Sequence, residues 1–441
     1  MLRRFIDISA FSPKIEWLLA DDDLGQWADL ESCIKWLWET LPPYEPLPLA
    51  YQPQTMVAED LSEELRLMEQ QELVKFCNIW LQSMVRADNP LREKVALFWH
   101  HHIPSSSGRL PDHGRLLIEE YRKYGLGRLK DLLNAVLSSS TMMWHLDLFG
   151  SHKNNPNENF AREFMELFTL GEGHYSLKDV KEAARALTGR YFDKKNYPYQ
   201  AYFDPSIFDD GVKTILGETG NLGGEEFIEI ILGQEQTARH ISRAVLRFFF
   251  SDNPTDQMVE SCAQAYFSSG YEMRALLECM FRHEAFLNPD YIKSKVKTPV
   301  ELLVGFQRQT GLRTVGMKTA YQFLMKCGQI LFYPPTVAGW PGGEDWLQGD
   351  RLLHRLFLPG ALIAVANRQV PKSSLAYKLS SRVFEPSKRG FRYIADAKWD
   401  KAMFYAALNR HGVPVSQWIL GEIHAESGLE ACLQYPEYQY C

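Results

Sequence analysis

The amino-acid sequence predicts an all-α protein: one large multi-helix globular domain with long loops and at most a small hairpin. Three observations support this fold class. Apolar residues make up 45% of the 441 residues, so the chain can bury a sizeable core. Apolar residues recur with the helical period along most of the chain, and capping residues stand at the ends of these segments. Few segments show the two-residue alternation of a half-buried strand.

The predicted helices have recognisable start and stop signals. Asn89 and Pro90 begin one helix, because Asn is a favourable N-cap and Pro suits the first helical position. Ser176 and Asp179 have the spacing of a capping box, and Gly171 ends the helix before them. Helical periodicity also covers the segments 58–86, 112–124, 128–148, 156–170, 236–250, 255–268, 272–286, 299–310, 316–330 and 349–366.

Two stretches do not show this periodicity. Residues 190–221 are rich in Tyr, Phe, Asp, Pro and Gly, and we expect a long loop or a small hairpin there. We expect it to fold back over the two helices that carry His102 and Glu163 and to bring Asp210 near them. Residues 333–349 form a second irregular stretch, which contains Pro334-Pro335 and the run Gly339-Trp340-Pro341-Gly342-Gly343. The main helical domain is expected at 55–368, with an N-terminal appendage at 1–54 and a C-terminal extension at 369–441.

Composition excludes several classes of protein. The net charge is -7 with both signs interspersed, which is unlike the basic face of a nucleic-acid-binding protein. No apolar run approaches the roughly 20 residues that span a bilayer, so no membrane span is predicted. The seven cysteines are widely spaced and include no Cys-x-x-Cys pair. We therefore do not expect a disulfide framework or a thiolate zinc site. We expect a cytoplasmic protein, because acidic residues interrupt the apolar part of the N-terminus where a signal peptide would need it.

A run of three histidines is the first segment that could carry chemistry. On a helix that starts at Pro90, His102 falls on the apolar face and His100 about 200° away from it. One interpretation is that His102 is a core histidine bonded to a backbone carbonyl. The other gives it a catalytic or metal-binding role, which His100 could share only if the helix unwinds near Ile103 and Pro104.

The segment 157–171 is the second candidate. Its helix has an apolar stripe of phenylalanines and an opposite stripe on which Arg162 stands four residues from Glu158 and from Glu166, the spacing of an ion-pair ladder. Glu163 instead borders the apolar stripe. A half-buried carboxylate needs a cation, a histidine or a metal ion as its partner, so we expect Glu163 to meet His102 directly or through a metal or water.

These segments carry a resemblance to a known family. The sequence resembles the bacterial domain of unknown function 1800 family through a set of landmarks that occur in one order. The set covers residues 55–365, and it consists of Trp99-His100-x-His102, the segment 157–171, residues 179–189, Asp210-Gly211-Val212-Lys213, Thr237-Ala238-Arg239 and Val337-Ala338-Gly339-Trp340-Pro341-Gly342-Gly343.

The resemblance implies an all-α domain but no settled reaction. It also implies a partner, because many members look secreted and occur beside a protein that resembles alkaline phosphatases and sulfatases. The sequence departs from the family pattern at Arg190, where a Trp is usual, and at Asp209, where a His is usual. The second departure removes a potential metal ligand.

Three functional hypotheses remain open from the sequence. The first is a metal-dependent enzyme, hydrolase or oxidoreductase, that binds a divalent metal such as Zn, Fe or Mn through nitrogen and carboxylate ligands. The second is a non-catalytic binding or assembly partner with a buried polar network and aromatic anchors. The third is a metal-free acid/base enzyme. The candidate catalytic residues are His102 and Glu163, the candidate metal ligands are His100, His102, Glu163, Glu166 and Asp210, and the candidate binding residues are Arg162, Arg185, Lys213 and Trp340.

Overall fold

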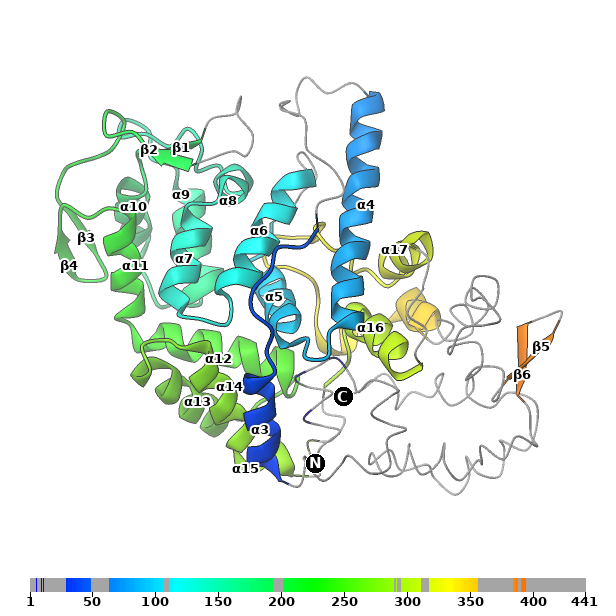
Figure 1. The fold of residues 1–441 in the computed structure, drawn as a ribbon. Coiled ribbons are helices and arrows are strands. Elements are labelled where there is room, and N and C mark those ends of the chain that lie inside the picture. Colours follow the sequence, from blue (N-terminus) through cyan, green and yellow to red (C-terminus); the bar gives the residue numbers. More distant parts are fainter. Residues whose placement is uncertain are drawn as a thin grey trace.

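The computed structural model shows a protein built mainly of α-helices, as the sequence predicts (Figure 1). It describes residues 5, 9, 11, 29–48, 63–105, 111–192, 201–288, 291, 295–310, 317–355, 384–387 and 390–393. The helices are α3 (Leu30–Glu39), α4 (Glu63–Arg86), α5 (Leu91–His102), α6 (Pro111–Tyr124), α7 (Leu129–Leu137), α8 (Ser140–His145), α9 (Glu158–Glu163), the π-helix η3 (Phe164–Thr169), α10 (Leu177–Ala186), α11 (Gly224–Leu232), α12 (Glu235–Phe249), α13 (Asp256–Ser268), α14 (Met273–Arg282), α15 (Glu284–Leu287), α16 (Pro299–Thr310), α17 (Met317–Lys326) and the 3-10 helix η5 (Gly343–Leu347).

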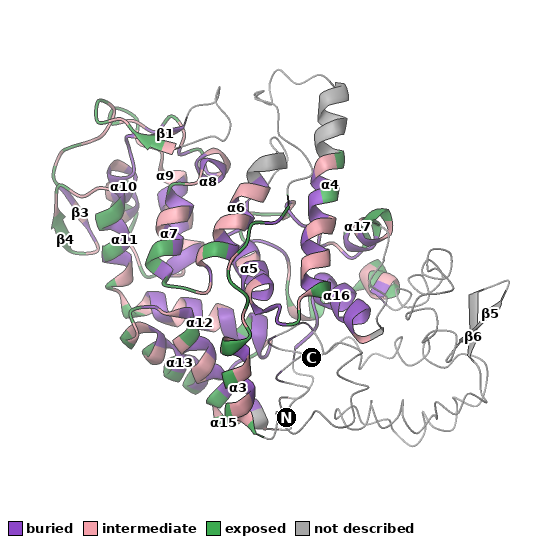
Figure 2. Cartoon of the chain, viewed as in Figure 1, coloured by how far each residue is buried: buried purple, intermediate pink, exposed green. Residues whose placement is uncertain are grey.

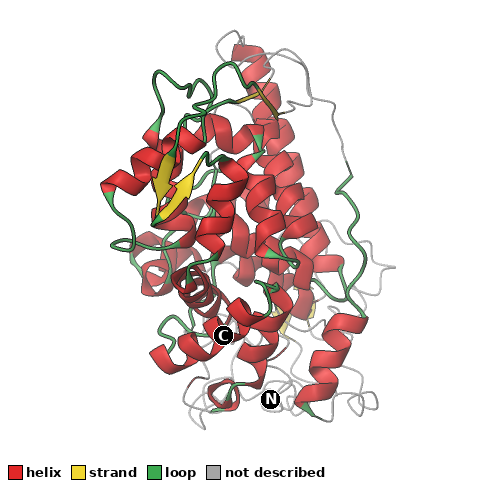
Figure 3. Cartoon of the chain, turned by 90° about the vertical axis from the view of Figure 1, so that its left-hand side faces the viewer, coloured by secondary structure: helices red, strands yellow, loops and turns green. Residues whose placement is uncertain are grey.

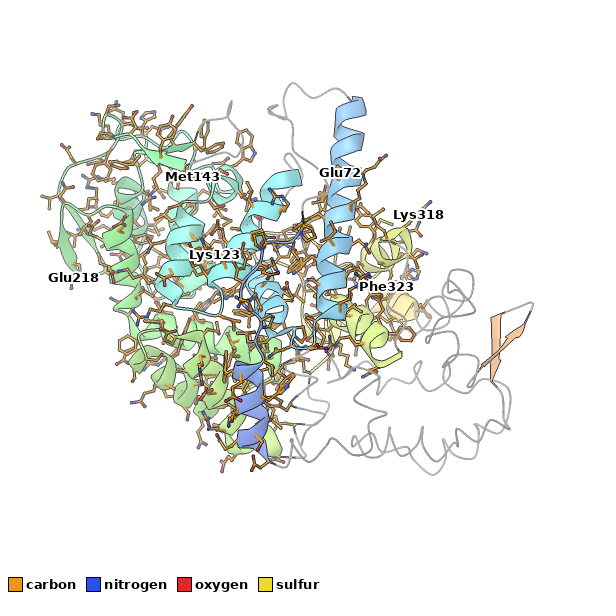
Figure 4. All side chains as sticks on the ribbon, in the orientation of Figure 1. Glu72, Lys123, Met143, Glu218, Lys318 and Phe323 are labelled. Carbon is orange, nitrogen blue, oxygen red and sulfur yellow. The ribbon has the colours of Figure 1, made fainter. Side chains whose placement is uncertain are left out.

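Strands make only two-stranded antiparallel sheets among the described residues. The strand β1 (Arg190–Phe192) pairs with β2 (Ala201–Phe203), β3 (Lys213–Ile215) with β4 (Glu218–Gly220), and β5 (Phe384–Ser387) with β6 (Gly390–Tyr393). In the view of Figure 3 the β3–β4 hairpin lies outside the helices, and Figure 4 labels Glu218 at its outer end. The irregular stretch 190–221 therefore holds two small hairpins, where at most one was expected.

Local side-chain caps explain where several helices begin. The Asn89 side chain accepts the backbone N–H of Leu91 at 3.2 Å, at the start of α5. Ser176 and Asp179 form both bonds of a capping box at the start of α10. These bonds satisfy backbone N–H groups that have no partner inside the helix. They join residues only two or three positions apart, so the sequence alone could predict them.

Two predicted helices are interrupted. The segment 128–148 divides into α7 and α8 at Ser138 and Ser139, where Ser139 takes an extended backbone conformation. The segment 272–286 divides at His283, which is extended and accepts the backbone N–H of Ala285 with its ring at 3.2 Å. The His283 ring therefore caps α15, whereas Ser139 makes no side-chain cap bond, and periodicity registers neither break. Of the predicted helix 349–366, residues 349–355 are helical and the rest lie outside the described residues.

Most of the described core is one continuous apolar cluster that includes α5, and Val296, Trp340 and Trp346 form a second, small cluster. In α5 every residue from Glu93 to His100 is buried, and α6, α12 and α4 pack around this helix (Figure 2). From the N-terminal segment 1–54, α3 packs against α14, and Arg282 on α14 binds Glu31 on α3 at 2.8 Å. No helix of the described residues is long and apolar enough to cross a membrane.

Candidate functional site

The three histidines at the end of α5 have different surroundings. His100 is 1% exposed, and its Nε2 accepts the backbone N–H of Phe332 at 3.0 Å. Because a backbone N–H can only donate, the proton of the neutral ring must sit on Nδ1. Burial lowers the pKa of His100 to about 3, so the ring is neutral near pH 7. With one nitrogen bonded and the other protonated, His100 offers no lone pair to a metal ion in this arrangement.

His102 holds the end of another helix. Its Nε2 lies 3.0 Å from the carbonyl oxygen of Phe168, and its ring stacks on Phe98 at 5.5 Å. A carbonyl oxygen only accepts, so Nε2 donates and the lone pair is on Nδ1. Burial, followed by repulsion from His240, lowers the pKa of His102 to about 3. The first interpretation from the sequence, a histidine bonded to a backbone carbonyl, is the arrangement observed.

The carbonyls that end the 157–171 segment are bonded by side chains from two other helices. His240 on α12 donates through Nε2 to Leu167 at 2.8 Å, and Gln236 donates to the carbonyl of Leu170 at 3.0 Å. Together with the bond from His102, these contacts satisfy carbonyls that a helix end otherwise leaves open. The last turns of this segment form the π-helix η3, and short π-helical stretches occur frequently at functional sites.

The glutamates of this segment are separated by their partners. Glu158 binds Arg162 at 3.0 Å, as the ladder spacing predicts, whereas Glu166 accepts the hydroxyl of Tyr175. Glu163 is partly buried. Burial, and then the neighbouring Glu166, raise the pKa of Glu163, and only Arg162 opposes them.

Asp210 belongs to a segment that docks on α10, and α10 itself packs against α9. The backbone N–H of Thr214 bonds to Glu182 at 3.1 Å, and Asp209 makes a bidentate pair with Arg185 at 2.7 and 3.0 Å. Asp210 itself is exposed. The residue that replaces the usual histidine of this turn, Asp209, is therefore a fixed partner of an arginine.

The predicted ligands do not form a metal centre within the described residues. No group of three or more His, Cys, Asp or Glu side chains there is placed to hold a metal ion. Because a metal of the predicted kinds needs about four ligands at roughly 2 Å, the residues present do not fit such an ion. The hydrogen bond of His100 is one physical reason, because it leaves this ring without a free lone pair.

The remaining predicted binding residues have structural contacts. Lys213 is buried, with its ammonium bonded to the Gly211 carbonyl at 2.9 Å and lying over the Phe208 ring. Trp340 is 5% exposed, and its ring packs against His100 at a centroid distance of 4.9 Å. Its loop comes close to α5 because Gly339 has no side chain: a Cβ there would lie 2.4 Å from the His101 carbonyl oxygen.

The comparison with known families agrees with the landmarks. A family described as a protein of unknown function (DUF1800) matches residues 16–440. The chain belongs to the DUF1800 family. The match covers nearly the whole chain and extends beyond the range of the landmarks, 55–365. No curated protein and no solved structure matches the chain.

Two features of this DUF1800 chain were missed by sequence reasoning. His240 and Gln236 flank the landmark Thr237-Ala238-Arg239, so their neighbourhood was recognised but their role was not. A buried ionic cluster was also missed: Glu301 lies 2.6 Å from Lys295 and 3.1 Å from Lys94, and each of the three side chains is at most 2% exposed. Sequence spacing offered no signal for the link to α5, because Lys94 meets Lys295 and Glu301 only in the folded chain.

Proposed function

We propose that this protein is a non-catalytic binding protein that docks another protein. The observation that carries the proposal is a group of exposed apolar side chains, here called the hairpin surface: Tyr202 and Phe203 on β2, and Val212 just before β3. Tyr202 is 48% exposed, Phe203 53% and Val212 67%. Exposed aromatic groups held in a fixed arrangement are the side chains that protein interfaces use as anchors.

Each exposed ring of the hairpin surface packs against another aromatic ring. Tyr202 packs against Tyr191 at 5.0 Å, and Phe203 against Phe208 at 5.2 Å. The Phe203 ring lies directly over Gly189, where a Cβ would approach it to 2.6 Å. Because the rings are already packed, binding would immobilise few new side chains, and this lowers the entropic cost of association.

A charged edge borders the same surface. Arg185 binds Asp209, Glu182 and the carbonyl of Val212, so the guanidinium is fixed beside the backbone of Val212. Apolar anchors with a fixed polar rim are the usual composition of a specific protein interface. The partner that the family resemblance implies, a protein similar to alkaline phosphatases and sulfatases, is the occupant we propose.

A binding experiment tests this proposal. The purified full chain is titrated calorimetrically with that phosphatase- and sulfatase-like protein. The double substitution Tyr202→Ser, Phe203→Ser should weaken binding at least tenfold, since hot-spot anchors contribute about 2 kcal/mol or more each. The matched control is Met325→Ser on α17, which is 46% exposed and far along the chain from the hairpin surface. Equal affinity of wild type and the double variant would overturn the docking surface.

Catalysis is a second candidate, and Glu163 is the observation that favours it. A partly buried carboxylate with a raised pKa beside a second carboxylate is a typical general acid. Its notional partner His102 is a weak base, because its pKa of about 3 leaves little driving force for accepting a proton near pH 7. The arrangement therefore supports the carboxylate more than the predicted His102–Glu163 pair.

Metal analysis separates the metal-dependent enzyme from the two hypotheses that need no metal. Elemental analysis of the purified protein should find no stoichiometric Zn, Fe or Mn, and a chelator should leave the melting temperature unchanged. His102→Ala should then lower stability by about 1–3 kcal/mol, because it removes the donor to the Phe168 carbonyl. Stoichiometric metal that is lost in His102→Ala would instead support the metal-dependent enzyme.

A further inference from the structure

Two cysteines face each other across consecutive helices. α13 and α14 form a helical hairpin, and they pack directly against each other (Figure 1). Cys262 lies seven residues before Ser269, the C-cap of α13, and Cys279 lies seven residues after Glu272, the N-cap of α14. Residues equally distant from the turn of an antiparallel hairpin lie side by side, and the side chains of these two cysteines are hydrogen-bonded to each other.

The two thiols differ in access. Cys262 has no exposed surface and belongs to the apolar core, whereas Cys279 is partly exposed at the edge of that core. A small reagent can therefore reach Cys279 first and Cys262 only through Cys279. This is the arrangement of an attacking thiol and a resolving thiol.

The chemistry of the pair agrees with this order. The hydrogen bond from Cys262 lowers the pKa of Cys279 to about 7 in spite of burial, and the charge of Arg282 acts in the same direction. The same hydrogen bond, together with burial, raises the pKa of Cys262. Cys279 thus carries roughly fifteenfold more thiolate at pH 7 than a cysteine with the reference pKa of about 8.5.

We propose that Cys262 and Cys279 are a thiol–disulfide modification site that low-molecular-weight disulfides oxidise. The Cys279 thiolate attacks one sulfur of the reagent, and the first reagent thiolate leaves. Cys262 then loses its proton and attacks the Cys279 sulfur of the mixed disulfide, which expels the second reagent thiolate. The protein loses two protons and two electrons, and the reagent is reduced to two thiols.

The resulting bond would tie α13 to α14 at the middle of both helices. Ring closure over this hairpin restricts the unfolded chain and raises its free energy. Since α14 also binds α3 through Arg282 and Glu31, the disulfide would stabilise the attachment of the N-terminal helix as well. This site is independent of the hairpin surface of the proposed function.

Peptide mapping of the intact chain tests the proposal. The reduced protein is incubated with oxidised glutathione at pH 7, alkylated and digested without reduction. A cross-linked peptide pair that contains Cys262 and Cys279 is expected, and the other five cysteines serve as internal controls. A glutathione adduct that stays on Cys279, or no reaction at either cysteine, would overturn the proposal.

Variants add a second readout. The wild type should melt at a higher temperature after oxidation, and Cys262→Ser should show no such rise but should retain the glutathione adduct on Cys279. Cys327→Ser, which removes a buried cysteine of another region, should respond to oxidation as the wild type does. A rise in melting temperature that persists in Cys262→Ser would contradict the assignment of the disulfide. The wild-type peptide map remains decisive if a variant does not fold.

Discussion

At the scale of single residues, hydrogen-bond direction decides what the candidate histidines can do. His100 accepts from a backbone N–H, whereas His102 donates to a backbone carbonyl. The two rings are therefore opposite tautomers, although they stand two residues apart. Protonation of His100 would place two N–H groups against each other, so its fold-stabilising form is the neutral one.

This predicts a pH dependence of stability. The pKa of His100 is lowered in the folded state to about 3 from 6.5, so below pH 6.5 the unfolded chain binds a proton that the folded chain does not. Stability is fully present above pH 6.5 and falls as the pH drops towards 3. For His100 alone the loss between pH 7 and pH 5 is about 2 kcal/mol.

Urea unfolding of wild type and His100→Gln at several pH values measures this loss. The glutamine keeps an acceptor for Phe332 but does not titrate, so the slope between pH 7 and 5 should become smaller. His174→Gln, at an exposed histidine, is the control and should leave the slope unchanged. An identical slope in wild type and His100→Gln would show that His100 is not neutral and buried as described.

At the scale of elements, the end of the π-helix depends on close approach of α12. Gly171 has a φ of +88° and leaves room for His240: a Cβ at Gly171 would lie 2.9 Å from His240 Nδ1. Gly173 has a similar φ of +84°, but a Cβ there would meet nothing within 4 Å. A comparison of substitutions at the two glycines therefore distinguishes the cost of backbone strain from the cost of the clash with His240.

We predict that Gly171→Ala is more destabilising than Gly173→Ala. Both substitutions carry the cost of a left-handed backbone, about 1 kcal/mol. Gly171→Ala must in addition displace the His240 ring and weaken its bond to Leu167, which adds about 1–3 kcal/mol. Chemical denaturation of both variants gives the comparison, and equal losses would show that His240 does not hold this helix end.

At the scale of the whole molecule, a buried ionic cluster connects α5 to α16. Lys94 comes from α5 and Glu301 from α16, and Lys295 lies just before α16. Burial raises the pKa of Glu301, but the ammonium groups of Lys295 and Lys94 outweigh it and hold the value at about 2. Removing the carboxylate would leave two buried cations facing each other.

Glu301→Gln should therefore destabilise the protein by about 3–5 kcal/mol near neutral pH. The contribution of the charged carboxylate is present above pH 4.5, the ordinary value, and is lost as the pH falls towards 2. The difference between wild type and variant should shrink over that range in thermal melts. Glu39→Gln breaks an exposed pair with Lys35 and should change stability by less than about 1 kcal/mol. If Glu301→Gln lost no more stability than Glu39→Gln, the result would contradict the role of the cluster.

Several features of this protein follow from the sequence by itself. The helical fold class, the capping box at Ser176, the pair between Arg162 and Glu158 and the family landmarks all depend on residues close together in the chain. Local hydrogen bonds and helical periodicity determine such features, so spacing is sufficient to predict them.

Only the tertiary structure decided which distant groups meet. Helical projection placed His102 on the same face of α5 as Phe98, on which its ring stacks, but it could not tell that its hydrogen-bond partner is the backbone carbonyl of Phe168. It also did not predict that His100, on the opposite face, is buried. It also could not place Asp210, whose segment docks on α10 through Thr214 and Glu182, or bring Lys94 and Glu301 together. Side-chain partners across elements depend on helix packing and on loop closure, and neither leaves a periodic signal in one sequence.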